Sequence, residues 1–385
     1  MMFDMTWTGR VRFGAGVSAQ VGELLRSLGA ERVVVVTDEN MERLGTADRI
    51  CAHLEAAEVH SCVFAGVEPE PSVETTDAVA ELAREHDCQA VVGLGGGSCM
   101  DVAKAVSILI TNQGSAAAYQ GQGLVKVPGV PKVMIPTTAG TGSEVTSTAV
   151  LSRKGDGFKG SISDDRLRPD YSFLDPELTF TMPPKVTAST GMDALVHALE
   201  GYTGRQASPF SDLFAREALT RIGKWLRIAT WNGKDLEARS EMLLASFYAG
   251  VTLANAGVGA CHALAYPLGG SFGVGHGCCN ALMLPYVVRY NVPARSDRYA
   301  QAAAWLGLGT EGWPDREAAL ACAEGLEDLV EDLSLPRKLS ALKAGIEEKH
   351  FDALAEVALG MADFLENNPR PLDKKACIVL YKEAF

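Results

Sequence analysis

The apolar positions in the first half of the chain alternate between two periodicities. Short runs rich in β-branched residues occupy 31–40, 58–67 and 89–98, and the first of them, ERVVVVTDEN, holds four consecutive valines. Apolar residues at helical spacing fill the intervals 41–58 and 72–86. An unbroken apolar run is typical of a strand that is covered on both faces. This alternation predicts a parallel sheet whose strands are joined by helical, right-handed crossovers.

The pattern changes at MPPKVTAST (182–190), where two prolines interrupt the chain and Ser189 or Thr190 could cap a helix. Almost everything that follows has helical spacing. Examples of helical segments are 192–202, 211–226, 237–256 and 316–333. A chain of 385 residues suits two domains of ordinary size. We therefore predict an α/β domain over 1–185 and an all-α domain over 186–385.

Composition narrows the choice of partners. Hydrophobic residues make up 47% of the chain and charged residues 22%, which is typical of a globular protein. A formal net charge of −13 repels phosphate backbones, so we expect no nucleic-acid partner. No apolar run approaches the ~20 residues that a membrane span needs. The nine cysteines form no CxxC motif, and their odd number indicates reduced thiols in the cytoplasm.

A run of glycines separates the strand at 89–98 from the helical pattern that follows it. In GLGGGSCMDVAKA (93–105), the turn is formed by Gly95, Gly96, Gly97 and Ser98. Glycines let a backbone approach a diphosphate closely, and amides at a helix N-terminus point toward an anion. The spacing resembles a dinucleotide fingerprint without completing it, so a plain strand-to-helix turn is the alternative. The carboxyl ends of parallel strands are where ligands bind, which favours the dinucleotide.

Two more segments bring polar groups to the same edge of the expected sheet. Asp38 ends the valine-rich strand, where a carboxylate would accept hydrogen bonds from a ribose and repel a 2′-phosphate, favouring NAD over NADP. The alternative role for Asp38 is to cap a helix. The loop PTTAGTGSEVT (136–146) suits phosphate and ribose contacts, and the alternative is a hairpin connection.

Four residues of the second half have side chains that bind divalent metals. Asp193 and His197 lie four residues apart in GMDALVHALEGY and share one helix face. They are either two ligands of one metal ion or a buried pair with a structural role. His262 and His276 lie in CHALAYPLGGSFGVGHG, whose glycines and proline predict an irregular loop that folds His276 back toward His262. Three imidazoles and one carboxylate suit Fe(II), Zn(II), Co(II) or Ni(II).

Together these segments resemble the iron-containing (group III) alcohol dehydrogenase family over essentially the whole chain. The matching motifs are GGGSCMDVAKA, PTTAGTGSEVT, GMDALVHALEGY, NAGVGACHALAYPLGG, GHGCCNALMLPYVVRYN and NPRPLDKKACIVLYKEAF. The resemblance implies a dehydroquinate-synthase-like fold, with an N-terminal Rossmann-like parallel-sheet domain that binds NAD and a C-terminal helical domain. It places the active site in the cleft and implies a homodimer or larger homo-oligomer.

The resemblance also implies roles for individual residues. The metal ligands fall on Asp193, His197, His262 and His276, and the implied ion is Fe²⁺, with Zn²⁺ or another divalent metal as the alternative. The cofactor contacts fall on Asp38, Gly95, Gly96, Gly97, Ser98, Asp101, Thr137, Thr138, Thr141 and Lys159.

The chain departs from the family pattern at Tyr266. Many relatives carry a second histidine in an H-x-x-x-H-P-L-G pattern, where this chain reads HALAYPLG. A phenol titrates near ~10, whereas an imidazole titrates near ~6.5. The catalytic candidates are Tyr266, for proton handling, and His276.

The expected reaction is hydride transfer between NAD(H) and a small primary alcohol or aldehyde. Short alkanals, diol-derived aldehydes and anionic aldehydes such as sulfo- or phosphonoacetaldehyde all fit, and Arg205 or Arg153 could pair with an anion. The alternatives are a dehydroquinate-synthase-type lyase, a glycerol-dehydrogenase-like polyol dehydrogenase, a metal-independent maleylacetate-type reductase and a nucleotide sensor. The intact ligand set argues against the last two. Against the lyase, this chain has no dense set of Lys, Arg and Asn residues around the metal motif to hold a polyhydroxylated phosphate substrate.

Overall fold

The structure is a computed structural model that describes residues 2–155 and 159–385. Contacts divide the chain into two compact units. One, here called the sheet unit, spans Trp7–Thr181. The other, here called the helical unit, comprises Met182–Phe385 together with the first residues of the chain up to Thr6.

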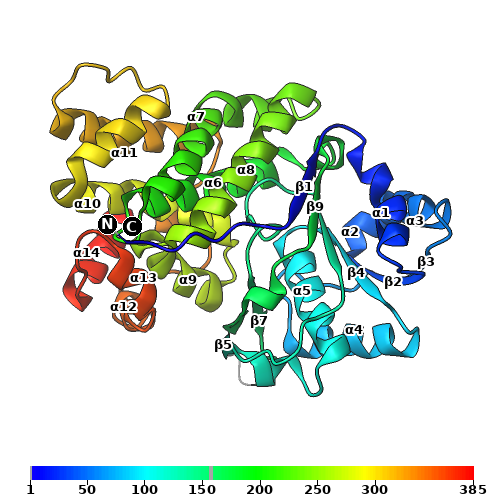
Figure 1. The fold of residues 1–385 in the computed structure, drawn as a ribbon. Helices are drawn as coiled ribbons and strands as arrows, with labels where there is room; N and C mark the ends of the chain where they lie inside the picture. The colour runs from blue at the N-terminus through cyan, green and yellow to red at the C-terminus, as the bar shows by residue number, and fades with distance from the viewer. Residues whose placement is uncertain (1, 156–158) are drawn as a thin grey trace. The chain divides into compact units, whose positions relative to one another are not determined.

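The sheet unit is built on a six-stranded parallel sheet with the order β1-β9-β6-β4-β2-β3 (Figure 1). Its strands are β1 (Arg10–Phe13), β2 (Arg32–Val36), β3 (His60–Phe64), β4 (Ala90–Gly95), β6 (Lys132–Pro136) and β9 (Tyr171–Leu174). Its helices are α1 (Val21–Ser27), α2 (Glu39–Arg43), α3 (Thr46–Glu55), α4 (Val73–Glu85) and α5 (Gly97–Thr111). The predicted alternation of parallel strands and helices is confirmed.

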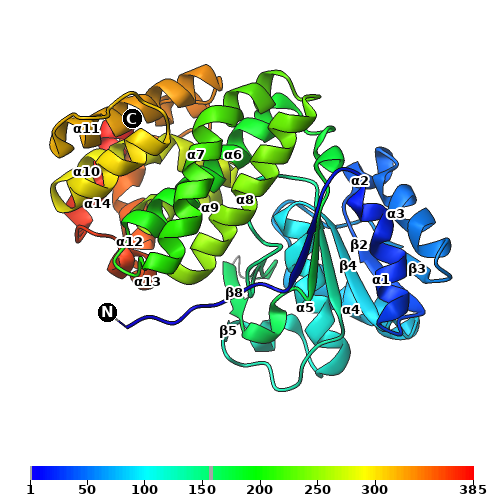
Figure 2. The same cartoon turned by 45° about the horizontal axis from the view of Figure 1, so that its top comes forward.

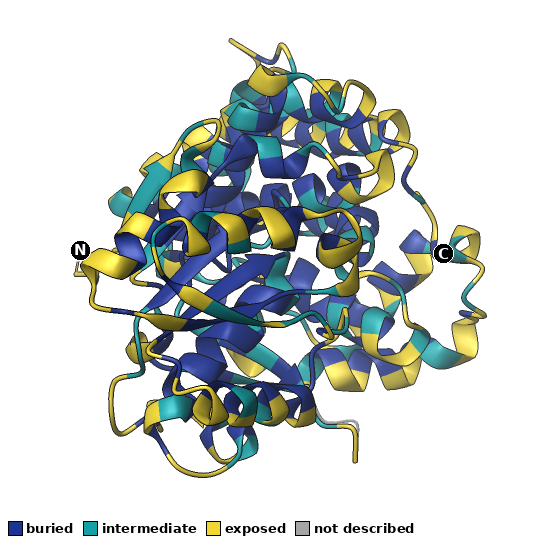
Figure 3. Ribbon diagram, turned by 90° about the vertical axis from the view of Figure 1, so that its right-hand side faces the viewer, coloured by how far each residue is buried: buried dark blue, intermediate teal, exposed yellow. Residues whose placement is uncertain are grey.

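Strand β2 shows why the four valines predict a strand covered on both faces. Val33 and Val35 pack in the apolar cluster that includes α1 and α3, whereas Val34 and Val36 pack in the cluster that includes α4 and α5. Figure 2 shows helices on both sides of this sheet, and in Figure 3 strands in the interior of the molecule are coloured as buried. All four side chains are fully buried, as expected for a central parallel strand.

A smaller sheet lies in the same unit, with the order β5-β8-β7. Its strands are β5 (Gly121–Gln122), β7 (Thr148–Ser152) and β8 (Lys159–Ser163), of which β7 and β8 are antiparallel. The 136–146 loop therefore leads from β6 in the large sheet to β7 in the small one. The hairpin alternative for this loop is wrong, because β6 and β7 do not pair with each other.

The helical unit is centred on α6, which packs against α7, α8 and α10 (Figure 1). Its helices are α6 (Pro184–Thr203), α7 (Pro209–Trp231), α8 (Leu236–Ala256), α9 (Ala260–Phe272), α10 (His276–Trp305), α11 (Asp315–Asp332), α12 (Phe351–Leu359), α13 (Ala362–Asn367) and α14 (Lys374–Ala384). No single helix in the described ranges has the length and apolar character to cross a membrane, and α8 and α9 meet that test only as a pair bent by 105°.

Helix α6 begins earlier than the expected caps. Its first residue is Pro184, whose ring fixes a helical φ at a position where no backbone donor is needed. Ser189 and Thr190 lie inside the helix, and their hydroxyls donate hydrogen bonds to the carbonyl of Val186. The capping prediction was therefore wrong.

The expected irregular loop after Cys261 is mostly helical. Residues from Ala260 to Phe272 form α9 even though Pro267 lies inside it. Most of its apolar side chains are buried, and that burial offsets the hydrogen bond that a proline cannot donate. Only Gly273, Val274 and Gly275 separate α9 from α10, and Gly273 ends α9 with a φ of 64°, which a residue without Cβ adopts readily.

Candidate functional site

Helix α6 carries three ionisable side chains on one face. Asp193, His197 and Glu200 follow one another at spacings of four and three residues, and all three are at most 6% exposed. Buried polar groups of this kind need partners, because an unpaired charge in an apolar interior is strongly unfavourable. The partners come from α9 and α10.

Three of the predicted metal ligands come together. The ligand atoms of Asp193, His262 and His276 all lie within 4.8 Å of one another. Asp193 Oδ1 is 3.9 Å from His262 Nε2 and 3.6 Å from His276 Nε2. One carboxylate oxygen and two imidazole nitrogens therefore face a common point.

The fourth predicted ligand, His197, lies beside this group. Its ring stacks on that of His262, with the ring centroids 4.9 Å apart and an angle of 16° between the planes. The structure thus places His197 next to the cluster, although the set of mutually close ligand atoms consists of the other three residues.

Gly277 allows the start of α10 to approach α6. A Cβ at this position would lie 2.2 Å from the carbonyl oxygen of Ser189 and 3.5 Å from the Cβ of Asp193. Any larger residue would push the first turn of α10 away from α6. Because His276 is the preceding residue, this close approach is what brings its ring to Asp193.

Asn280 places its amide nitrogen at the point that the three ligand atoms face. Its Nδ2 is 2.8 Å from Asp193 Oδ1 and 3.2 Å from the Nε2 atoms of both His262 and His276. An amide has two hydrogens, so three acceptors exceed what it satisfies. A small cation would satisfy all three, and a mixed nitrogen and oxygen donor set suits Fe²⁺ or Zn²⁺.

The electrostatics of the cluster favour an ionised carboxylate. Burial opposes the ionisation of Asp193, but the three surrounding histidines and the hydrogen bond from Asn280 outweigh it and lower its pKa below the usual value. A carboxylate that stays ionised while buried is the form that a metal ligand requires.

Tyr266 lies next to His276. Its ring centroid is 5.0 Å from that of His276 in an edge-on arrangement and 5.9 Å from that of Phe364. An aromatic ring thus lies directly beside His276, whose side chain is 38% exposed.

The glycine turn after β4 has the close-packed backbone that the sequence predicts. Gly95 has a φ of 146°, and a Cβ there would lie 2.6 Å from the Cys99 sulfur. A Cβ on Gly97 would lie 2.9 Å from Thr141, and one on Gly96 would lie 3.5 Å from Thr138. The glycine turn and the 136–146 loop are therefore in direct contact at the N-terminus of α5.

Thr138 has a hydroxyl that lacks a hydrogen-bond partner among the described residues, although its oxygen is fully buried. A buried hydroxyl of this kind fits a polar ligand that supplies the missing partner. Thr137 is buried as well, and its backbone amide donates to the carbonyl of Gly95. The loop thus presents a polar atom toward the glycine turn, which fits the phosphate or ribose of a dinucleotide.

Asp38 has a structural task at this edge. Its Oδ1 accepts hydrogen bonds from the amides of Asn40 and Met41 and so caps α2, and its Oδ2 lies 3.5 Å from the thiol of Cys99. The capping alternative for Asp38 is therefore correct. Because Cys99 lies in the first turn of α5, its contact with Asp38 also shows that this carboxylate lies next to the glycine turn.

Other predicted cofactor residues are engaged within the protein. Asp101 accepts hydrogen bonds from Ser143 Oγ at 2.6 Å and from the Val150 amide at 2.9 Å, and it pairs with the buried Lys104 at 2.9 Å. It therefore ties α5 to the 136–146 loop and to β7. The Ser98 hydroxyl donates to the carbonyl of Pro69.

Lys159 lies on the small sheet. Its amine is 3.3 Å from Glu70 Oε1, next to the Pro69 carbonyl that Ser98 contacts. A chain of contacts thus joins Lys159 to the glycine turn through the Pro69–Glu70 segment.

Sequence reasoning missed two residues, Glu200 and Asn280. Glu200 Oε2 lies 2.6 Å from His262 Nδ1, and Asn280 lies at the centre of the cluster. Both were detectable by helical spacing, since Glu200 lies seven residues after Asp193 and Asn280 lies four residues after His276.

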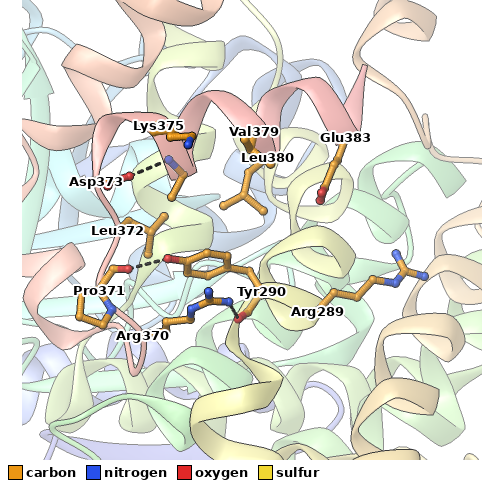
Figure 4. A pocket seen from close by; sticks show the side chains of 11 residues that line it. Arg289, Tyr290, Arg370, Pro371, Leu372, Asp373, Lys375, Val379, Leu380 and Glu383 are labelled. Atoms are coloured by element: carbon orange, nitrogen blue, oxygen red, sulfur yellow. Dashed lines mark hydrogen bonds between the residues drawn. The ribbon is translucent and has the colours of Figure 1, made fainter.

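A surface pocket of about 690 Å³ lies elsewhere in the helical unit. It is formed by α10 and α14 with the segment before α14, and Figure 4 shows the ring of Tyr290 beside the guanidinium of Arg370. Its lining includes none of the predicted site residues.

Comparison with known families finds matches over nearly the whole chain. Residues 8–176 match the family described as iron-containing alcohol dehydrogenase, and residues 187–385 match the C-terminal region of the Fe-containing alcohol dehydrogenase family. Both matches are to one family, and together they span the sheet unit and the helical unit.

Similar individual proteins include several dehydrogenases. A long-chain-alcohol dehydrogenase 1 from Geobacillus thermodenitrificans is 39% identical over 377 residues, which is 97% of this chain and 94% of that protein. A solved 1,3-propanediol oxidoreductase superposes with a TM-score of 0.97 at 34% identity, with full coverage of both chains. A sulfoacetaldehyde reductase from Bifidobacterium kashiwanohense, solved in complex with NAD⁺, gives a TM-score of 0.90 at 32% identity, covering 100% of this chain and 99% of that one.

Proposed function

Because the chain belongs to the iron-containing alcohol dehydrogenase family, we propose that Asp193, His197, His262 and His276 hold the divalent metal ion of an NAD-dependent alcohol dehydrogenase. The observation that carries the proposal is the convergence of Asp193 Oδ1 with two imidazole nitrogens on the position of the Asn280 amide. His197 completes the set, since α6 places it one turn from Asp193 and its ring lies against that of His262.

The family uses NAD and a divalent metal, and each has a distinct task in the reaction. When bound, the ion supplies a positive charge that polarises the oxygen of the alcohol or aldehyde, and the nicotinamide accepts or returns the hydride. The protein supplies one buried negative charge through Asp193 and neutral rings through the histidines. The net positive charge that results favours an oxygen that gains negative charge during the reaction.

For the cofactor, we propose that the glycine turn and the 136–146 loop bind NAD. Gly95, Gly96, Gly97 and Ser98 would hold the diphosphate at the N-terminus of α5, and the buried hydroxyl of Thr138 would bond to the cofactor. Thr137 and Thr141 would shape the same loop. Asp38 would favour NAD over NADP because its carboxylate lies beside Gly95, where a Cβ would be 3.6 Å from Asp38 Oδ2.

Asp101 and Lys159 have supporting parts in this proposal. Asp101 holds the loop against α5 through its bonds to Ser143 and Val150. Lys159 reaches the cofactor region through its contact with Glu70.

We propose a small, uncharged primary alcohol or aldehyde as the substrate. The ring of Tyr266 beside His276, with Phe364 packed against that ring, supports an apolar neighbour rather than an anion. In this proposal, the Tyr266 hydroxyl takes part in proton transfer and His276 both binds the ion and packs against that phenol ring.

A small anionic aldehyde is the second candidate, favoured by the similarity to a sulfoacetaldehyde reductase. Its two candidate anion partners have other contacts. Arg153 donates to Gln120 Oε1 at 2.6 Å, and the guanidinium of Arg205 is 3.4 Å from the carbonyl of Pro369.

The test combines metal analysis with kinetics. Protein purified under anaerobic conditions should contain about one divalent metal ion per chain, and chelation should abolish NADH oxidation with short aldehydes. His262→Ala should have the same effect, whereas Arg205→Ala should reduce neither metal content nor turnover of propanal. Unchanged turnover after His262→Ala and metal stripping would refute the proposal, and a preference for sulfoacetaldehyde over propanal would favour the anionic substrate.

We also infer that the protein works in the reducing cytoplasm as a homodimer or larger homo-oligomer. All nine cysteines are thiols, including Cys62 and Cys88, whose sulfurs lie 3.6 Å apart.

Light scattering coupled to gel filtration measures the oligomeric state, and a monomer would contradict the inference that the protein is a homo-oligomer.

A further inference from the structure

We propose that Glu200 is a positioning residue, which sets the tautomer and orientation of His262 for metal binding. The inference rests on the proposed metal site and goes beyond its ligands. Glu200 is 6% exposed, lies on α6 one turn after His197, and reaches across to the first turn of α9.

The two carboxylate oxygens of Glu200 have different partners. Oε2 lies 2.6 Å from His262 Nδ1, and Oε1 accepts a hydrogen bond of 2.6 Å from the backbone amide of Cys261. A carboxylate oxygen is an acceptor, so in this arrangement the Nδ1 hydrogen of His262 points toward Oε2. The lone pair of Nε2 then faces Asp193 and Asn280, as a metal ligand requires.

The bond to Cys261 fixes the position of the ring as well as its tautomer. Helix α9 begins after Gly259, which has no side chain to cap it, and Glu200 supplies the missing acceptor from another helix. Gly259 leaves the space for this contact, since a Cβ there would lie 3.1 Å from Glu200 Oε1. One carboxylate therefore joins the helix of Asp193 to the helix of His262.

A glutamine at this position cannot reproduce both bonds. The amide has one acceptor oxygen, whereas the site presents two donors, the Nδ1 hydrogen of His262 and the amide of Cys261. Glu200→Gln keeps the volume of the side chain, but it either loses the bond to Nδ1 or donates an amide hydrogen to Nδ1, which places the proton of His262 on Nε2 and blocks metal binding there. The loss of partners that hold metal ligands typically weakens metal binding by about 10–100-fold.

The matched control is Asp235→Ala. Asp235 also accepts a hydrogen bond from an amide in the first turn of a helix, Ala238 of α8, but it contacts no predicted ligand. The substitution Asp235→Ala removes a carboxylate that caps a helix of the same unit, and Asp235 does not contact His262.

The experiment measures Zn²⁺ affinity by competition with a chromophoric chelator, and the His262 tautomer by ¹⁵N-histidine NMR of the metal-free protein. We expect Glu200→Gln to weaken Zn²⁺ binding at least 10-fold and Asp235→Ala to change it less than 3-fold. In the wild type, His262 should carry its proton on Nδ1, and this preference should weaken in Glu200→Ala.

Two results would overturn the inference: an Nε2-protonated His262 in the wild type, or Zn²⁺ affinities of the Glu200 variants within 2-fold of the wild type. The wild-type tautomer requires no variant to fold. If the wild type itself binds no divalent metal, the proposed function fails, and the tautomer measurement still decides whether Glu200 positions His262.

Discussion

Glu144 is expected to make the stability of the sheet unit fall as the pH rises. It lies in the 136–146 loop, is 1% exposed, and no described residue donates a hydrogen bond to its Oε1. Burial raises the pKa of Glu144 from its ordinary 4.5 to about 7, and a backbone hydrogen bond and the nearby charge of Lys104 only partly offset that rise.

The sign and size of the effect follow from this pKa. Between pH 4.5 and 7 the folded protein keeps a proton that the unfolded chain has released, so the free energy of unfolding decreases with rising pH. Each pKa unit corresponds to about 1.4 kcal/mol, so the full loss is about 3 kcal/mol above pH 7. Most of it, about 2–3 kcal/mol, develops between pH 5 and pH 8.

Glu144→Gln removes the titrating group and should remove this loss. The amide has an unfavourable burial cost of its own, but that cost is the same at every pH and cancels in a comparison between two pH values. For a unit of this size, 1 kcal/mol shifts the midpoint of thermal unfolding by about 2–4 °C. The difference in midpoint between variant and wild type should therefore become more favourable to the variant by roughly 5–10 °C from pH 5 to pH 8.

The assay is scanning calorimetry of the metal-free, cofactor-free protein at pH 5, 6, 7 and 8. Glu81→Gln serves as the control, because Glu81 is exposed on α4 and its removal takes away one carboxylate without a buried site. A variant-minus-wild-type difference that is constant across pH would refute the reasoning. So would a control that shows the same trend as Glu144→Gln.

Three further substitutions test the two sites. Gly277→Ala places a methyl group 2.2 Å from the Ser189 carbonyl, so the start of α10 must move; Zn²⁺ affinity should fall at least 10-fold in a chelator competition, and an unchanged affinity would contradict this. Thr138→Val removes the buried hydroxyl without a partner; NADH affinity should fall about 5-fold or more in a fluorescence titration without loss of thermal stability, whereas unchanged affinity would place the cofactor elsewhere. Tyr266→His introduces a group that titrates near ~6.5 beside His276; kcat measured from pH 5.5 to 10 should gain an inflection between about pH 6 and 7, and a profile that matches the wild type would exclude Tyr266 from proton transfer.

The sequence predicts the sheet unit well where one local pattern decides the structure. Four consecutive valines predict β2 because β-branched side chains favour a strand that is covered on both faces. A glycine run after a strand predicts the turn at Gly95 because a residue without Cβ adopts backbone conformations that other residues avoid. The small sheet was not predicted. Strand β8 pairs with β7 through polar and small residues, from Lys159 to Ser163, whose pairing depends on the rest of the unit rather than on an apolar pattern.

Helix α9 shows where a local sequence pattern predicts the wrong structure. Pro267 and the glycines that follow it favour a loop locally, yet this segment is helical because its apolar residues are buried in the helical unit. Tertiary packing outweighs a local preference of a few kcal/mol when enough apolar surface is buried. The amino-acid pattern therefore located His262 and His276 but gave the wrong conformation between them.

Helical spacing identified His197 as a candidate ligand, and it places Glu200 on the same helix face without revealing the partner of Glu200. Both lie on the face of α6 that carries Asp193, and periodicity gives the direction of a side chain without the distance to its partner. That distance is set by other helices: a Cβ on Gly259 would lie 3.1 Å from Glu200 Oε1, and a Cβ on Gly277 would lie 2.2 Å from the Ser189 carbonyl. Two glycines thus allow α9 and α10 to approach α6 until a carboxylate on one helix reaches a ring on another. The sequence therefore shows which ionisable residues can form the site and which glycines allow helices to approach closely. Only the folded structure shows which glycine brings which side chain to its partner.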